Sequence, residues 1–298
     1  LLEAGHDVIV LDNLSNSSEE SLKRVQELTG KTLKFIQGDI RNQSDLDQAF
    51  SSNRIDAVIH FAGLKAVGES QQIPLTYFDH NISGSIQLVQ AMERAHVFNL
   101  VFSSSATVYG EENSPPYQEN MVLGMPNNNY GYTKLIVEQL LEKLSKANDE
   151  WSIALLRYFN PVGAHKSAQI GEDPQGIPNN LMPYLTQVAV GCREKLSIFG
   201  QDYPTDDGTC ERDFIHVVDL AKAHVLAVEN RLKHKGCRAW NIGTGIPISV
   251  LKIKETFEKV NGVIVNSEFV ERRAGDLACF YADASRANRE LNWTPELT

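Results

Sequence analysis

Short apolar runs alternate with segments of helical character along the first half of the chain, and this alternation is the strongest constraint on its fold. The runs cover residues 8–11, 33–36, 57–61, 99–102 and 151–159. Residues 8–11 are apolar at every position, which is typical of a strand buried on both faces, and the other segments are mostly apolar. Such strands, joined through helices by short connections, predict an α/β fold with a parallel sheet and helices on both of its faces.

Small or polar residues follow four of these strands, at Asp12, Asp39, Gly63 and Ser105. The carboxyl ends of parallel strands meet at one edge of a sheet, where doubly wound, Rossmann-type folds bind dinucleotides. We expect Asp12 to bind both ribose hydroxyls of NAD and to repel the 2'-phosphate of NADP. Asp39 is placed to reach the adenine amino group. A turn carboxylate at Asp12 and a helix N-cap at Asp39 are the alternative interpretations.

The glycine-rich phosphate-binding turn of such folds belongs about 20 residues before the acidic residue that binds the ribose. Counted back from Asp12, that turn would precede Leu1. We therefore expect the sheet in this chain to lack its first strand and the phosphate loop.

Tyr130 and Lys134 lie four residues apart in a segment that is predicted to be helical, so their side chains share one helix face. A fixed ammonium beside a phenol favours the phenolate, which would lower the pKa of Tyr130 and make it a base near neutral pH. The spacing alone is a short pattern, and a half-buried tyrosine beside a solvated lysine is the alternative.

The composition changes near residue 165, where glycine, proline, asparagine and aspartate become frequent up to residue 180. Such a segment suits a domain switch and a binding loop. We expect an NAD-binding domain at 1–159 and a smaller mixed α/β substrate domain at 160–298. Residues 213–243 are expected to return to the first domain.

Two arginines in the second half, Arg212 and Arg273, are candidates for binding a diphosphate, because a guanidinium grips phosphate oxygens with two parallel hydrogen bonds. Ordinary surface charge is the alternative for both. His60, inside an apolar strand, is expected to be a core histidine. His216 and His224 lie eight residues apart, too far for one metal site on a helix face, so we expect structural roles and no metal.

The formal net charge of −10 argues against nucleic acid or an anionic membrane as the main partner. The four cysteines form no C-x-x-C pair, which fits the reducing cytoplasm and suggests neither a zinc site nor disulfides. No apolar run reaches the roughly 18 residues that a membrane-spanning helix needs.

Five longer runs carry a family resemblance that covers almost the whole chain. They lie at 60–70 (HFAGLKAVGES), 102–110 (FSSSATVYG), 157–164 (RYFNPVGA), 171–181 (GEDPQGIPNNL) and 272–277 (RRAGDL). Together they resemble the extended short-chain dehydrogenase/reductase family, and within it the epimerases that act at C4 of a UDP-hexose.

The resemblance implies a bound NAD, a UDP-hexose substrate and a set of residues for each. Tyr130 would be the base on the sugar 4-hydroxyl, Lys134 would hold the nicotinamide ribose, and Ser105 would relay the proton. The residues implied for NAD are Asp12, Asn13, Asn16, Ser17, Asp39, Ile40, Phe61, Ala62, Gly63, Lys65, Asn81, Ser103, Tyr130, Lys134 and Phe159. The residues implied for the substrate are Lys65, Ser105, Tyr130, Asn160, Asn180, Leu181, Ile198, Phe199, Arg212, Arg273, Asp276 and Phe280.

The resemblance also implies an isomerase that removes hydride from C4, lets the flat 4-keto sugar turn, and returns hydride to the opposite face. UDP-glucose and UDP-galactose would be interconverted in this way. Phe280 stands where relatives with a small residue also accept N-acetylhexosamines, so we expect it to exclude the N-acetyl group. A homodimer through the helices at 74–95 and 130–146 is likewise implied.

Four alternatives stand beside this function. A nucleotide-sugar 4,6-dehydratase needs an extra acid and base before the Val-Tyr-Gly, but this chain has Ala106 and Thr107 there. A uronic-acid epimerase remains open, as does an inactive fragment of the enzyme. A protein that binds NAD without turnover has no need for Ser105, Tyr130 and Lys134 together.

Overall fold

The computed structural model describes residues 1–174, 176–273 and 275–297. Its central feature is a parallel four-stranded sheet in the order β3-β4-β5-β9, which confirms the doubly wound α/β prediction. A second parallel pair, β1-β2, forms a separate sheet among the described residues. These strands are β1 (Ile9–Asp12), β2 (Lys34–Gln37), β3 (Val58–His60), β4 (Asn99–Ser105), β5 (Ser152–Tyr158) and β9 (Gly236–Ile242).

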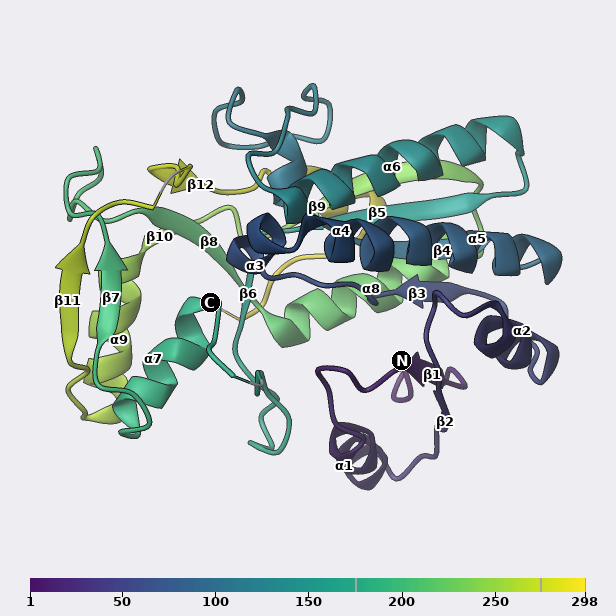
Figure 1. Ribbon diagram of the computed structural model, residues 1–298, viewed down its shortest axis with the longest axis horizontal. Helices are drawn as coiled ribbons and strands as arrows, with labels where there is room; N and C mark the ends of the chain where they lie inside the picture. Colours follow the sequence, from purple (N-terminus) through teal and green to yellow (C-terminus); the bar gives the residue numbers. More distant parts are fainter. Residues whose placement is uncertain (175, 274, 298) are drawn as a thin grey trace.

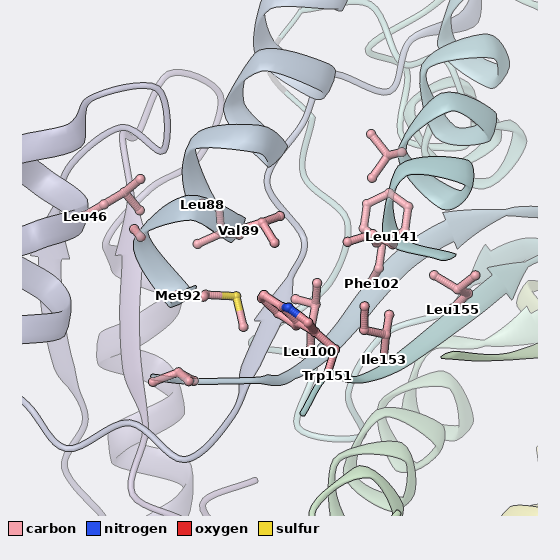
Figure 2. Packing of buried hydrophobic residues seen from close by; sticks show 13 residues of the cluster. Leu46, Leu88, Val89, Met92, Leu100, Phe102, Leu141, Trp151, Ile153 and Leu155 are labelled. Atoms are coloured by element: carbon pink, nitrogen blue, oxygen red, sulfur yellow. The ribbon is translucent and has the colours of Figure 1, made fainter. Parts of the chain in front are cut away.

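Side chains alternate along β4 between the two covered faces of this sheet. Leu100 and Phe102 pack with Met92 and Leu141 in the core shown in Figure 2, whereas Val101 joins a second core on the other face. Figure 1 shows α5 and α6 on one side of the sheet and α8 on the other. The helices of this part are α1 (Glu20–Thr29), α2 (Gln43–Ser51), α5 (Gly84–Arg94), α6 (Asn129–Ala147), α8 (Val217–Arg231) and α10 (Ser285–Leu291).

The helical segment expected at 74–95 consists of three consecutive elements. They are α4 (Pro74–Tyr77), the π-helical η1 (Phe78–Ser83) and α5, and they follow the short α3 (Val67–Gln72). A π turn is wider than an α turn and is frequent at functional sites. In η1 it accompanies Asn81, which is buried and hydrogen-bonds the main chain of Leu64 and the hydroxyl of Thr133.

The second half of the chain builds a mixed sheet around β8 (Glu211–His216). β8 pairs in parallel with β6 (Asn160–Val162) and β12 (Cys279–Phe280), and antiparallel with β10 (Pro247–Ser249). A further parallel pair, β7 (Leu196–Phe199) with β11 (Ser267–Val270), lies at the left end of the molecule in Figure 1 beside α7 (Leu181–Ala189) and α9 (Val250–Asn261). Both halves therefore contain parallel strands, but only the second mixes strand directions.

The chain returns to the first sheet after β8. Helix α8 packs against β4 and β5, and β9 adds the outer strand beside β5, close to the return expected at 213–243. Helix α10 also packs on α8 and β9. None of the helices in the described part of the chain is long and apolar enough to cross a lipid bilayer.

Candidate active site

The helix that carries Tyr130 and Lys134 starts at the carboxyl edge of the four-stranded sheet. Asn128 is its N-cap, and its side-chain oxygen accepts a 2.8 Å hydrogen bond from the Gly131 amide. An asparagine at this position satisfies one of the free amides of the first turn and fixes where the helix begins. Tyr130 is thereby held in the first turn, partly exposed, at the edge where the strands end.

Three consecutive serines at the end of β4 contact this helix through different groups, namely the Ser103 carbonyl and the Ser104 and Ser105 hydroxyls. The Lys134 amine is buried and donates a 2.7 Å hydrogen bond to the Ser103 carbonyl. The Ser105 hydroxyl accepts a 3.0 Å hydrogen bond from Thr107 and lies close enough to the Tyr130 phenol to lower its pKa. The structure therefore gathers Ser105, Tyr130 and Lys134 in one cluster, as the sequence predicted.

The expected lowering of the Tyr130 pKa is wrong for this structure. Burial has the larger effect and raises the pKa of Tyr130 to about 12, against the smaller opposite influence of Ser105. Burial also lowers the pKa of Lys134 to about 8. The reason is geometric, because the Lys134 amine is directed at the Ser103 carbonyl and lies 5.8 Å from the centre of the Tyr130 ring. Desolvation is therefore the largest influence on the pKa of each group.

Acidic residues at the ends of β1 and β2 form a polar group suited to a ribose. Asp12 uses its Oδ1 to accept hydrogen bonds from the Leu14 amide and the Ser17 hydroxyl, each 2.7 Å long. These two bonds leave its Oδ2 available, so Asp12 has the acceptor that a ribose hydroxyl needs. Asn13 donates a 3.0 Å hydrogen bond to Asp39, which brings the two strand ends together.

Asp39 is not the N-cap of the next helix, since Asn42 has that role and accepts from the Ser44 amide. The Asp39 carboxylate instead forms a 2.7 Å ion pair with Arg41, and this contact holds the pKa of Asp39 well below its usual range. Asn16 is exposed, and Ile40 is partly buried beside Gly84, so the roles of both in NAD binding stay predictions.

The loop after β3 offers a surface to a flat ring. Phe61 is 59% exposed and stacks on the buried His224 at 4.8 Å between ring centres. Ala62 and Gly63 follow it and are exposed. At Gly63, φ is +151° and an added Cβ would lie 3.0 Å from the Asn81 oxygen, so this close backbone position requires glycine. Asn81 therefore acts on the predicted NAD site through this loop.

A cluster of opposite charges forms between β8, β7 and the loop before β12. Arg212 donates to the Leu277 carbonyl at 2.8 Å and to Asp276 at 3.2 Å. Arg273 pairs with the other oxygen of Asp276 at 3.3 Å and lies over the ring of Phe199 at 4.2 Å. The structure thus joins four of the predicted substrate residues and leaves guanidinium groups at a partly exposed position, where a diphosphate can reach them.

Aromatic rings connect this cluster to the end of β5. Phe280 lies beside Arg212 in the β12–β8 register and packs on Phe159 at 5.3 Å and on the buried Tyr117 at 4.6 Å between ring centres. Asn160 follows Phe159 directly and pairs with Phe214 in the β6–β8 register. A predicted cofactor residue, Phe159, therefore touches a predicted substrate residue, Phe280.

Two predicted polar residues meet at a carboxylate that the sequence reasoning did not single out. Glu172 accepts a 2.6 Å hydrogen bond from Asn180 and lies 3.3 Å from the amine of Lys65. Leu181 begins α7 and is partly buried against the core of the β7–β11 region.

The side chain of Ile198 lies in the core under β7 and does not face Arg273. It is 1% exposed and belongs to the core under β7, because successive strand residues point to opposite faces and Phe199 has the face toward Arg273. The side chain of Ile198 is therefore enclosed in this core, and its place in the uridine diphosphate site stays a prediction.

Histidines have structural roles, as expected. His60 is buried and its Nε2 lies 2.8 Å from the Ser85 hydroxyl, while burial lowers its pKa to about 3. His216 is the N-cap of α8, where Nδ1 accepts from the Val218 amide. His224 is buried with Nδ1 2.8 Å from the Leu220 carbonyl, and its Nε2 meets the Tyr158 hydroxyl.

A buried polar group behind the cluster was missed by the sequence reasoning. Glu138 lies one turn beyond Lys134 and pairs with Arg157 of β5 at 2.7 Å. The four-residue spacing in the sequence places residues 130, 134 and 138 on one helix face, which could have pointed to Glu138. The structure shows that Lys134 and Glu138 are both buried on that face. Nothing in the sequence pattern pairs residue 138 with residue 157.

A doubly wound sheet with tyrosine, serine and lysine gathered at its carboxyl edge, beside carboxylates suited to a ribose, defines the class of dinucleotide-binding enzymes. Residues 1–243 match the NAD dependent epimerase/dehydratase family, and the chain belongs to that family.

Several known proteins are similar to this chain over nearly its full length. A UDP-glucose 4-epimerase of Bacillus subtilis (strain 168) is 56% identical over 293 residues, which is 98% of this chain and 86% of the relative. The crystal structure of UDP-glucose 4-epimerase from Bifidobacterium longum in complex with NAD+ and UDP has a TM-score of 0.96 and 48% identity, over 100% of this chain and 89% of that chain. The enzyme from Stenotrophomonas maltophila, with bound NAD and formylated UDP-arabinopyranose, has a TM-score of 0.97 and 50% identity, over 100% and 88% of the two chains.

Proposed function

We propose that this protein is an NAD-dependent epimerase that interconverts UDP-glucose and UDP-galactose, a reaction of galactose metabolism. One relationship carries the proposal. The loop before the catalytic helix touches the arginine loop, because the Asn127 amide donates to the Gly275 carbonyl at 3.3 Å. A base at Tyr130 and cations at Arg212 and Arg273 are thereby held at two ends of one site, which suits a sugar tethered through a diphosphate.

The residues of the chain divide the work between the two ends of the substrate. Arg212 and Arg273 hold the diphosphate, and Asp276 keeps the two guanidinium groups oriented. Tyr130 takes the proton of the sugar 4-hydroxyl and returns it, and Ser105 hydrogen-bonds the same oxygen. Bound NAD would supply the reversible uptake of the C4 hydrogen as a hydride, and its positive charge would favour the ionised form of Tyr130.

Inversion requires that the sugar be free to turn while the nucleotide end stays bound. The charged contacts of this site lie at the diphosphate end, whereas the rings of Phe159 and Phe280 offer no hydrogen bonds to sugar hydroxyls. A dehydratase would need a further acid and base, but Ala106 is buried and Thr107 donates its hydroxyl to Ser105. The arrangement therefore favours epimerisation.

The test is to incubate the purified protein with UDP-galactose and to follow the appearance of UDP-glucose by proton NMR. We expect conversion to an equilibrium mixture without net formation of NADH. Protein that contains bound NAD but leaves UDP-galactose unchanged would contradict the proposal. Turnover of UDP-glucuronate in place of UDP-galactose would establish a uronate epimerase instead.

A second copy of the chain is the partner that we propose for the outer faces of α5 and α6. These faces border a shallow groove of about 370 Å³. Its lining is mostly apolar and consists of Ile86, Val89, Gln90, Glu93, Leu140, Lys143, Leu144, Ala147 and Trp151. Burial of such a surface stabilises a symmetric pair. Light scattering should give twice the chain mass for the wild type and the single mass for Leu140→Glu.

The proposal also covers the two domains and the compartment. Residues 1–159 form the NAD-binding domain and 160–298 mainly the UDP-sugar domain, supported by the return of α8 and β9 to the first sheet. The four cysteines are free thiols, which supports a reducing, cytoplasmic location.

A further inference from the structure

Three residues spaced by four on α6 meet three consecutive residues of β4. Tyr130 lies near Ser105, the Lys134 amine donates to the Ser103 carbonyl, and the Glu138 carboxylate accepts from the Ser104 hydroxyl at 2.5 Å. The first two contacts belong to the catalytic cluster. The third continues the same stripe one turn deeper into the protein, where the reaction itself has no need of a charge.

Glu138 is fully enclosed and its partners come from a single row of the sheet. Arg157 donates to its two oxygens at 3.0 Å and 2.7 Å, and the exposed fractions of the two side chains are 3% or less. Ser104, Arg157 and Asn241 are register neighbours on β4, β5 and β9. Tyr109 completes the group, because it accepts from Arg157 at 3.1 Å and donates to Asn241 at 2.6 Å.

Stability alone is a weak reason for this group. A buried ion pair usually contributes little compared with well-packed apolar side chains of similar volume, because both charges must leave water. Apolar packing is available on this face, since Leu155 lies two residues before Arg157, Phe102 is the register partner of Leu155 on β4, and both belong to the main core. Glu138 is present in spite of the free-energy cost of burying a charged group, and it lies one turn from the catalytic Lys134. This combination points to a role in the reaction.

We propose that Glu138, held in place by Arg157, is a positioning residue that keeps Lys134 charged and fixes α6 against the serines of β4. The inference deepens the proposed function and rests on it. Glu138 does not touch the reacting atoms. It acts through Lys134, whose ammonium group in turn favours the ionised form of Tyr130.

The electrostatics of Lys134 agree with this geometry. Burial lowers the pKa of Lys134, and Glu138 is the group that acts in the opposite direction. The other titratable groups around this amine are Tyr130 on the same helix, His60 on β3, and Tyr158 and Arg157 on β5. His60 is neutral above about pH 3, and burial raises the pKa of Tyr158 well above its usual range. Neither side chain therefore carries a charge near neutral pH.

The test compares the wild type with Glu138→Gln and with the double variant Glu138→Gln/Arg157→Met. We expect kcat of each variant to fall about tenfold and KM to change less than about twofold, because Glu138 influences the chemical step and not substrate binding. The pH at which kcat falls on the alkaline side should move down by about one unit, since Lys134 then loses its proton more easily. Glu138→Gln leaves Arg157 buried without its carboxylate partner. The double variant also replaces Arg157, so an effect on the charge of Lys134 can be distinguished from misfolding caused by an unpaired arginine.

A purely structural ion pair predicts different results. The double variant would then recover the wild-type kcat and pH profile, and that recovery would overturn the inference. Asp219→Asn is the matched control, because Asp219 is also a fully buried carboxylate but binds the amides of residues 296 and 297 far from α6. Its pH profile should equal that of the wild type.

A readout without catalysis keeps the two proposals apart. The free energy of unfolding, measured by urea titration between pH 6 and 10, should begin to rise at a lower pH in Glu138→Gln than in the wild type. An unchanged onset would overturn the inference whether or not the protein is active. Wild-type protein that fails to epimerise UDP-galactose would instead contradict the proposed function.

Discussion

The Lys134 amine donates a 2.7 Å hydrogen bond to the main-chain carbonyl of Ser103. This contact ties the catalytic helix to the last strand residues before the turn, and it explains why the lysine does not lie directly against the tyrosine hydroxyl. The distance between Lys134 and Tyr130 is therefore set by the strand as well as by the helix.

Replacement of Tyr130 by phenylalanine should lower kcat roughly a thousandfold, the order of magnitude that a general base contributes. The hydroxyl is the proton acceptor, and its removal leaves the ring packing intact. Steady-state conversion of UDP-galactose is the measurement. Tyr132→Phe is the matched control, since Tyr132 is two residues away and packs on Phe78. Equal activity of the two variants would show that Tyr130 is not the base.

Lys134 should make the stability of the protein depend on pH. Its pKa is about 8 in the folded chain and 10.5 in an unfolded one, so the unfolded state binds more protons between these values. The free energy of unfolding should therefore rise with pH in this window, by roughly 3 kcal/mol in total. Below pH 8 the charged lysine opposes folding by this full amount.

The measurement is the difference in unfolding free energy between the wild type and Lys134→Met across pH 7 to 11. Subtraction removes the contributions of other lysines and tyrosines that titrate at high pH. We expect the variant to be the more stable protein at pH 7 and to lose this advantage by about pH 10.5. A constant difference across the range would show that Lys134 titrates normally.

Arg273→Met should weaken UDP binding about 30-fold or more, because a charge-assisted contact to the diphosphate is lost. Isothermal titration with UDP measures this effect. The neighbouring Arg272→Met is the control, since Arg272 pairs with Asp202 at 2.7 Å and stacks on Tyr203 at 4.1 Å, away from Asp276. Similar losses in both variants would indicate a general effect of charge and no specific phosphate ligand.

Phe280→Ser should allow turnover of UDP-N-acetylglucosamine, with a gain of about tenfold or more in kcat/KM for that substrate. The phenyl ring packs on Phe159 and Tyr117, so its removal opens space beside the predicted sugar position. Phe269→Ser, on the exposed β11 strand, is the control. Wild-type protein that already accepts the N-acetyl sugar would contradict the role of Phe280.

Local sequence pattern was sufficient for most of the first half of the chain. Predominantly apolar segments predicted β1 to β5 to within a few residues, because buried strands need mostly apolar side chains. The π-helical η1 was not foreseen, since its residues have the same apolar spacing as an α-helix. The structural role of Asn81 depends on its hydrogen bonds with Leu64 and Thr133, which are distant in the sequence, so the local pattern did not reveal it.

Residues of the second half show where pattern reasoning fails. Ile198 and Phe199 are both apolar, and only the packing of β7 decides which of them faces the core. Glu172 contacts two of the predicted residues, Asn180 and Lys65, and the contact with Lys65 joins segments that are far apart in the sequence. In both cases the missing information was which distant segment lies opposite.

The sequence by itself determined the parallel sheet, the helix face shared by Tyr130 and Lys134, and the polar residues at the strand ends. These features depend on side-chain periodicity and on neighbours within a few residues. Tertiary structure alone decided that burial raises the pKa of Tyr130, and that Arg157 pairs with Glu138 one helical turn beyond Lys134. Desolvation and ion pairing depend on which atoms surround a group in space, and residues far apart in the chain supply those atoms.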